Sequence, residues 1–181
     1  MLVYPCPWRM FGRWGFEVLS HGTTMRDELK EILGLKNVMR AGWVRAGIDS
    51  PESVAAHSWG MSMLALKLTP PHLDLARVLS LCIVHDIPEV RVGDLTPHDD
   101  TSNKAADEHN AMKALAPQWV ALFEEYEQGE TPESRFVKQL DKLDMALQAE
   151  LYQEQFNLPL EEFIESARKR ISDSELIHLL S

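Results

Sequence analysis

Histidines and an aspartate interrupt two apolar stripes that should face a protein interior. His57 comes three residues after Val54 and four residues before Met61, so a helix through this segment places the imidazole on the stripe that these two residues define. The adjacent pair His85 and Asp86 continues a second apolar row, which ends in Leu-Cys-Ile-Val. An isolated charge on a buried face costs several kcal/mol unless it is paired or bound to a metal. These positions are therefore candidates for chemistry.

Asp141 lies on the apolar face of a third predicted helix, beside Val137 and Leu140, and Asp144 follows one turn later as a candidate partner that orients a ligand. Imidazole and carboxylate groups that converge from three helices form a mixed nitrogen and oxygen site, which suits a divalent transition metal. Each residue also has a structural interpretation, as a buried histidine satisfied by one hydrogen bond or as an aspartate paired with a neighbouring lysine. The ordered set favours the metal site, because a histidine, a His-Asp pair and a later aspartate each lie on a separate apolar helix.

Start and stop signals mark the helices that must position these residues, and no segment alternates in a way that requires a strand. Thr24 is a predicted N-cap, and the pairs Ser50-Pro51 and Thr131-Pro132 predict two further helix starts. Helices are predicted over residues 26–33, 51–68, 73–89 with a break or bend at Pro88, 102–115, 117–128 and 132–153, followed by one or two over 160–180 with a Ser172/Glu175 capping box. The sequence predicts an all-α fold.

Length and composition indicate one domain and exclude several classes of protein. The 181 residues are 45% hydrophobic, which is enough for one substantial core. The 28 acidic and 18 basic residues give a net charge of −10, which disfavours binding to nucleic acid or to an anionic membrane surface. Two cysteines without a CxxC pair argue against a disulfide scaffold and for a reducing compartment. We therefore expect a cytoplasmic protein that binds a small molecule, with neither nucleic acid nor a membrane as partner.

The first 24 residues differ from the rest of the chain. Prolines, glycines and bulky aromatic residues follow one another there without a helical or alternating period. The segment has no uninterrupted apolar region and no small-residue cleavage site, so a secretory signal is not expected, while a transit-like segment and a start at Met25 stay open. We predict a loosely ordered extension over residues 1–24 and one domain over residues 25–181.

Three short segments place the candidate residues in a recurring pattern. They are Pro-Glu-Ser-Val-Ala-Ala-His at 51–57, His-Asp-Ile-Pro-Glu at 85–89 followed by Gly93 and Asp94, and Lys-Gln-Leu-Asp at 138–141. The pattern resembles the HD-domain metal-dependent phosphohydrolases and is most similar to their 5'-deoxynucleotidase branch, over roughly residues 29–152. This resemblance implies a single compact HD-domain helical bundle with a metal site between three helices.

The resemblance also implies roles for individual residues. It implies that one divalent cation, either Mn, Co, Fe or Zn with Mg also open, is bound by His57, His85, Asp86 and Asp141. Glu89 and Asp94 fall where the family has its acid/base and water-positioning carboxylates, beside a water whose pKa the cation lowers. The structural alternatives are a solvated charge at a helix end for Glu89 and a turn residue after glycine for Asp94.

Arg40 and Trp43 lie in the segment that lines the sugar and phosphate end of the pocket in the family. Trp43 precedes His57 by fourteen residues, as the family's pocket tryptophan does, and its bulk would exclude a ribose 2'-hydroxyl. The bacterial pattern has arginine directly before that tryptophan, whereas here Gly42 stands there and the nearest arginine is Arg40, an arrangement similar to that of the eukaryotic branch. The alternative for Trp43 is an anchor in the core or at a dimer interface.

The function that the resemblance implies is hydrolysis of deoxyribonucleoside 5'-monophosphates to a deoxynucleoside and phosphate, carried out by a homodimer. One alternative is an HD phosphohydrolase that acts on a triphosphate or an alarmone pyrophosphate, although Pro88-Glu89 stands where the alarmone branch has paired acidic residues. Another is a non-catalytic nucleotide-binding module, which would be expected to lack a ligand. His72, His98 and His109 are expected at the surface and not as ligands of a second metal.

Overall fold

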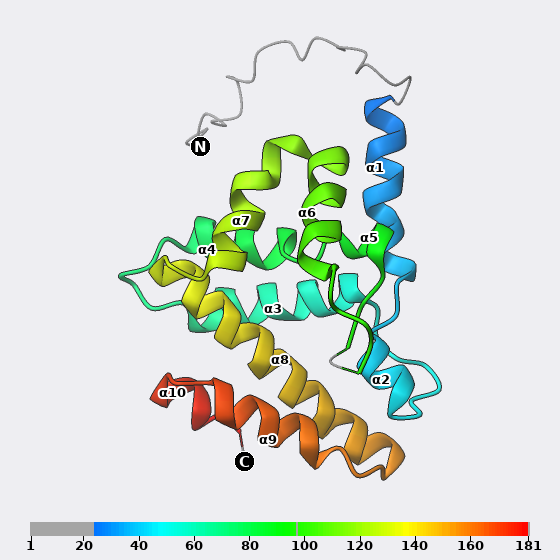
Figure 1. Ribbon diagram of the computed structural model, residues 1–181. Coiled ribbons are helices and arrows are strands. Elements are labelled where there is room, and N and C mark those ends of the chain that lie inside the picture. The colour runs from blue at the N-terminus through cyan, green and yellow to red at the C-terminus, as the bar shows by residue number, and fades with distance from the viewer. Residues whose placement is uncertain (1–23, 97, 181) are drawn as a thin grey trace, which may run out of the picture.

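The computed structural model describes residues 24–96 and 98–180, and this part of the chain is helical (Figure 1). Its α-helices are α1 (Met25–Leu33), α2 (Ala41–Arg45), α3 (Val54–Leu68), α4 (Leu75–Val84), α5 (Glu89–Val92), α6 (Lys104–Leu115), α7 (Val120–Gln128), α8 (Pro132–Phe156), α9 (Glu161–Arg170) and α10 (Ser174–Ile177), with 3-10 helices η1 (Gly34–Asn37) and η2 (Pro117–Trp119). The predicted all-α class is confirmed. The extension predicted over residues 1–24 lies outside the described residues, apart from Thr24.

Helix α8 is the longest element and contacts most of the other long helices. It packs against α3, α4, α7 and α9, and Figure 1 shows α9 running back alongside it. Helix α3 also packs against α4, while α6 packs against α5, α7 and α1. Three helices that the sequence marked with ionisable residues, α3, α4 and α8, are therefore in mutual contact. In the described part of the chain, none of the helices combines the length and hydropathy that a membrane span requires.

The main hydrophobic core lies where these three helices meet. Its buried side chains include Met61, Ala65, Val78, Leu81, Cys82, Val137, Leu140 and Leu143. Full burial of one large apolar side chain stabilises a fold by about 1.5–3 kcal/mol, so this packing fixes which face of each helix points inward. The ionisable residues on the same faces are carried into the interior with them.

Side-chain caps define several helix starts. Thr24 accepts a hydrogen bond from the Asp27 backbone N–H and forms a capping box with it, and Thr131 caps α8 directly before Pro132. Asp74 caps α4 by accepting from the backbone N–H groups of Ala76 and Arg77. The predicted starts at Thr24 and Thr131 are confirmed, because an oxygen at the N-cap satisfies N–H groups that have no partner within the helix.

The predicted helix start at Ser50-Pro51 is wrong. Helix α3 begins at Val54, and Ser53 caps it by accepting from the Ala56 backbone N–H. The preceding residues are extended because their backbone pairs with residues 38–40: the Arg40 N–H donates to the Glu52 carbonyl, and the Val54 N–H donates to the Val38 carbonyl. A contact between segments distant along the chain has overridden a local signal.

Two further expectations need correction. The helix predicted over 73–89 ends at Val84, and a turn separates it from α5, so the break expected at Pro88 is present but begins earlier. The Ser172/Glu175 capping box is also wrong, because Asp173 caps α10. The Ser172 hydroxyl instead lies within hydrogen-bond distance of the Gln139 side chain on α8.

Candidate metal centre

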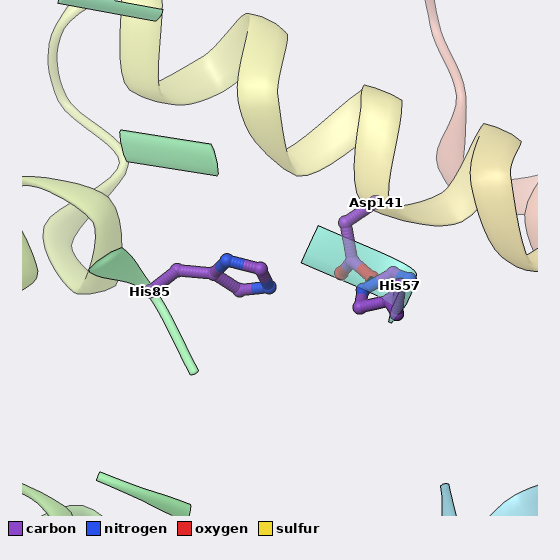
Figure 2. Close-up of side chains that lie close together, drawn as sticks. All are labelled: His57, His85 and Asp141. Atoms are coloured by element: carbon purple, nitrogen blue, oxygen red, sulfur yellow. Dashed lines mark ion pairs between the residues drawn. The ribbon is translucent and has the colours of Figure 1, made fainter. Parts of the chain in front are cut away.

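Three side chains from three helical segments meet in one buried cluster. His57 comes from the first half of α3, His85 directly follows α4, and Asp141 comes from α8 (Figure 2). Each offers a ligand atom, and these atoms all lie within 4.8 Å of one another. His57 Nε2 is 3.3 Å from Asp141 Oδ1, and Figure 2 shows the His85 ring pointing toward that pair. The structure thus brings together three of the four predicted ligands as a compact group.

The hydrogen bonds of the two histidines leave the same nitrogen of each ring available. His57 Nδ1 lies 2.7 Å from Asp144 Oδ2, and His85 Nδ1 lies 3.0 Å from the Cys82 carbonyl oxygen. Both acceptors take a proton from Nδ1. The Nε2 atoms are buried and have no hydrogen-bond partner among the residues that the structure describes. Metal-binding histidines show this pattern, because a partner on one ring nitrogen fixes the tautomer and directs the other lone pair at the ion. The donor set therefore fits a divalent cation.

Charges around the cluster set its protonation in the absence of metal. Burial and Arg40 lower the pKa of His57, but the carboxylates of Asp141 and Asp144 outweigh them and raise it to about 9. Burial would raise the pKa of Asp141, but the Lys142 ammonium at 2.7 Å and His57 hold it well below its ordinary value. In metal-free protein at neutral pH the His57 ring is therefore a positively charged imidazolium with a proton on both nitrogens. A cation that binds Nε2 must displace one of these protons.

Asp86, the fourth predicted ligand, lies at the open side of the cluster. Its Oδ2 is 3.0 Å from His85 Nε2 and 4.0 Å from His57 Nε2, and the Arg40 guanidinium is 3.8 Å away. Burial opposes ionisation of Asp86, yet His85, His57 and Arg40 lower its pKa below the ordinary value. Asp86 is thus an ionised carboxylate beside both histidines.

Glu89 is the first residue of α5 and is almost completely buried, with 3% of its surface exposed. Within the described part of the chain its Oε2 has no hydrogen-bond partner, and the Lys104 ammonium lies 3.9 Å from Oε1. Burial and the negative charges of Asp86 and Asp94 raise the pKa of Glu89 to about 10. A neutral carboxylic acid that borders a cleft at pH 7 is suited to donate a proton.

Asp94 has a structural role that the sequence did not reveal. Its Oδ2 accepts a hydrogen bond of 2.7 Å from the backbone N–H of Ala41, the first residue of α2. Gly93, which comes directly before it, has a φ of 81°, a conformation that favours glycine. Asp94 therefore connects the segment after α5 to the start of α2 while it borders the cleft.

The two predicted substrate residues lie close together but in different environments. Arg40 precedes α2 and faces Asp86, and although burial lowers its pKa, Asp86, Asp141 and Asp94 raise it above the ordinary value. Trp43 borders the cleft, yet only 1% of its surface is exposed. Its indole N–H donates to Glu52, and its ring packs against Tyr152 and Phe163. The structural alternative of a core anchor thus describes most of the contacts of Trp43.

A cleft of about 1290 Å³ opens from the cluster between α2, the segment before α6, and helices α8 and α9. His72 and His98 are exposed at its edges, and His109 lies 3.6 Å from Glu124 outside it. None of these three belongs to the groups of residues that can hold a metal within residues 24–96 and 98–180.

Sequence reasoning missed two neighbours of the centre. The Tyr126 hydroxyl lies 3.4 Å from Asp141 Oδ2, and its ring lies 4.8 Å from that of His85. Tyr126 follows buried Phe123 by three residues, so helical spacing was a usable signal for its burial. Lys104, beside Glu89, begins a polar helix, and nothing in its local sequence distinguishes it from a surface lysine.

The chain is similar in sequence and in structure to known proteins. The HD domain family model matches residues 32–177. The protein named 5'-deoxynucleotidase HDDC2 from Bos taurus is 38% identical over 159 residues, which cover 81% of this chain and 78% of that protein. The 5'-deoxynucleotidase hdd1 of Schizosaccharomyces pombe is 37% identical over 137 residues, 68% of this chain and 69% of its own. The crystal structure of the PH0347 protein from Pyrococcus horikoshii superposes with a TM-score of 0.75 at 32% identity, covering 85% of this chain and 94% of that one.

Proposed function

The chain belongs to the HD domain family, as its motifs predicted, and we propose that it is a 5'-deoxynucleotidase, which hydrolyses deoxyribonucleoside 5'-monophosphates to a deoxynucleoside and phosphate. The observation that carries this proposal is the pair of buried Nε2 atoms of His57 and His85, which make no hydrogen bond among the described residues and face the carboxylates of Asp141 and Asp86 at the base of an open cleft. Relatives named 5'-deoxynucleotidase from a mammal and a yeast support the substrate class.

The proposed metal ligands are His57, His85, Asp86 and Asp141. A divalent cation held there supplies positive charge that activates water and offsets the charge of the phosphate. Imidazole and carboxylate together accept Mn, Co, Fe or Zn, and Mg is a further candidate. Asp86 is the least enclosed of the four, which suits a ligand at the side where substrate enters.

Glu89 is the proposed general acid. Hydrolysis of a phosphomonoester leaves an alkoxide-like 5'-oxygen, which needs a proton as the bond to phosphorus breaks. Burial and neighbouring carboxylates keep the proton on Glu89 at neutral pH, and its Oε2 has no competing hydrogen-bond partner in residues 24–96 and 98–180. Asp94 assists from a distance, because its negative charge favours the protonated form of Glu89 and its carboxylate anchors the start of α2.

Arg40 is the proposed contact for the phosphate group. A chain with a net charge of −10 needs a local cation to attract an anionic substrate. The guanidinium of Arg40 lies 3.8 Å from Asp86, so it reaches the edge of the metal centre and stays charged at all working pH values. Trp43, held rigid by Glu52 and two aromatic rings, is the proposed wall against a ribose 2'-hydroxyl.

The assembly and setting of the enzyme are proposals that rest on the sequence. We propose a homodimer, as the family resemblance implies, in which one HD domain over residues 25–181 forms each subunit. The acidic net charge supports a protein with no nucleic-acid or membrane partner, and the sparse cysteines support a cytoplasmic location.

The test is phosphate release from dAMP and from AMP by metal-stripped protein refilled with Mn or Co. We expect cleavage of dAMP but not of AMP, and loss of activity in Asp86→Ala. Asp107→Ala, which removes an exposed carboxylate on α6, is the matched control and should behave as the wild type. Equal cleavage of both nucleotides would contradict the proposed role of Trp43. No release from either by metal-loaded protein would contradict the nucleotidase itself.

A further inference from the structure

Gly60 lies in the interior of α3, where glycine is an unfavourable residue. Glycine costs a helix about 1 kcal/mol relative to alanine. A Cβ atom added to Gly60 would lie 2.3 Å from Asp144 Oδ1, and its three nearest neighbours would all be atoms of the Asp144 carboxyl group. Of the glycines that the structure describes, Gly60 alone meets another atom at less than 3.0 Å in this way. The space beside Gly60 is thus occupied by one carboxylate.

That carboxylate holds His57 in place. Gly60 follows His57 by three residues, so both face α8 from the same side of α3. Asp144 Oδ1 occupies the space beside Gly60, while Oδ2 lies 2.7 Å from His57 Nδ1. One carboxyl group therefore contacts both residues, and its contact with the imidazole directs the unpartnered Nε2 toward Asp141.

We propose that Gly60 is a positioning residue of the metal centre, because its missing side chain leaves the space from which Asp144 orients His57. This inference rests on the proposed role of His57 as a metal ligand. A methyl group at position 60 would push on the end of a side chain and not on backbone, so Asp144 would rotate away and α3 would remain folded. His57 would then lose the partner that orients it, and metal binding would weaken.

A competing interpretation is that Asp144 is itself a metal ligand. Glu52, His57 and Asp144 offer ligand atoms within 4.8 Å of one another. The 2.7 Å between His57 Nδ1 and Asp144 Oδ2 is a hydrogen-bond distance, and the ring nitrogen that makes no hydrogen bond among the described residues is Nε2, which faces Asp141. The geometry therefore favours a hydrogen bond to the ligand over a second ion.

The experiment is a double-mutant cycle on metal affinity, measured without substrate by competition with a chromophoric Co²⁺ chelator. The chains compared are the wild type, Gly60→Ala, Asp144→Ala and the double variant. We expect Gly60→Ala to weaken Co²⁺ binding by about 10- to 100-fold, the usual effect of losing a partner that orients a ligand. In the Asp144→Ala background the same change should have an effect within about twofold, because its target is gone. Gly42→Ala, which adds a methyl group in ordinary contact with Phe163, is the control and should bind Co²⁺ as the wild type does.

A second readout follows His57 itself. In Zn-loaded protein labelled with ¹⁵N-histidine, the wild type should show a slowly exchanging Nδ1–H signal from His57, and Gly60→Ala should lose it.

The proposal would be overturned if Gly60→Ala left the Co²⁺ affinity unchanged. It would also be overturned if Gly60→Ala lowered that affinity equally in the wild type and in Asp144→Ala. A fall from two bound ions to one in Asp144→Ala would overturn it as well. If Gly60→Ala failed to fold, folding of the double variant would support the clash with Asp144, and failure of both would overturn it. Because no nucleotide is present, these results do not depend on the nucleotidase activity.

Discussion

On one side of the cleft His57 and Asp141 lie inside helices of 15 and 25 residues, whereas on the other side Arg40 and Asp94 lie next to helices of 5 and 4 residues. The first side is held by the apolar core around α3, α4 and α8. The second is held by individual polar contacts, such as the Asp94 carboxylate on the Ala41 N–H. A packed core fixes ligand positions closely, which a metal requires, while polar contacts at the mouth allow the substrate side to be adjusted separately.

Removal of a ligand on the packed side should have the largest effect. We expect Asp141→Ala to lose stoichiometric metal and to lower the rate of dAMP hydrolysis by about 10³-fold or more, since a metal contributes several kcal/mol to phosphoryl transfer. Metal content and phosphate release check this. Asp49→Ala is the same substitution at an exposed site and should change neither quantity. Full metal content in Asp141→Ala would show that the packed side is not the ligand side.

Glu89 begins α5 on the mouth side and borders the cleft, and its loss should affect chemistry without affecting the metal. Glu89→Gln keeps the size of the side chain and removes the transferable proton, so we expect kcat for dAMP to fall by about 10²-fold with metal content unchanged. The fall should be much smaller for 4-nitrophenyl phosphate, whose leaving group needs no proton. An equal loss for both substrates would assign Glu89 a role other than general acid.

At the mouth, loss of Arg40 should weaken substrate use and leave the metal in place. A charge-assisted hydrogen bond contributes about 1.5–3 kcal/mol, so Arg40→Gln should lower kcat/KM for dAMP by about 10- to 100-fold. Arg45→Gln is the matched control, because Arg45 pairs with Asp99 near the surface and exposed pairs contribute about 1 kcal/mol or less. Weaker metal binding in Arg40→Gln would contradict a separation between mouth and centre.

The same contrast explains which features the sequence predicted. The periodicity of apolar residues placed His57, His85 and Asp141 on inward faces, because helices of this length can bury only one face. At the mouth, local signals failed: Ser50-Pro51 did not start a helix, since Glu52 pairs with Arg40 across the chain. Long-range polar contacts leave no periodic trace in a sequence.

Helix α3 shows that sequence reasoning also missed a residue on the packed side. Its stripe revealed His57, but Gly60 carries no apolar signal and its relation to Asp144 depends on how α3 and α8 approach each other. The ligand roles of His57, His85, Asp86 and Asp141 and the roles assigned to Glu89, Asp94, Arg40 and Trp43 came from the family resemblance and stay predictions. Their common location around one cleft is what the structure adds.

Metal affinity on the packed side should depend on pH, because protons compete with the cation for His57. The pKa of His57 in metal-free protein is raised to about 9, so below that pH each bound cation must displace one proton. Apparent Co²⁺ affinity should therefore rise by about tenfold per pH unit and level off near pH 9. Asp144→Asn removes a charge that raises this pKa, so the plateau should begin at lower pH. Affinity independent of pH between 6.5 and 9 would contradict protonation of His57.

The smallest effect should come from Asp94, which holds the mouth together through one backbone contact. Asp94→Ala leaves the Ala41 N–H without its acceptor, and loss of such a cap costs about 1 kcal/mol of stability. The midpoint of urea unfolding should therefore fall slightly, and Asp94→Asn, which keeps an acceptor oxygen, should restore most of it. Metal affinity should stay unchanged in both variants, because Asp94 contacts α2 and not the packed helices. A loss of metal as large as that of Asp141→Ala would mean that the mouth and the metal centre form one cooperative unit.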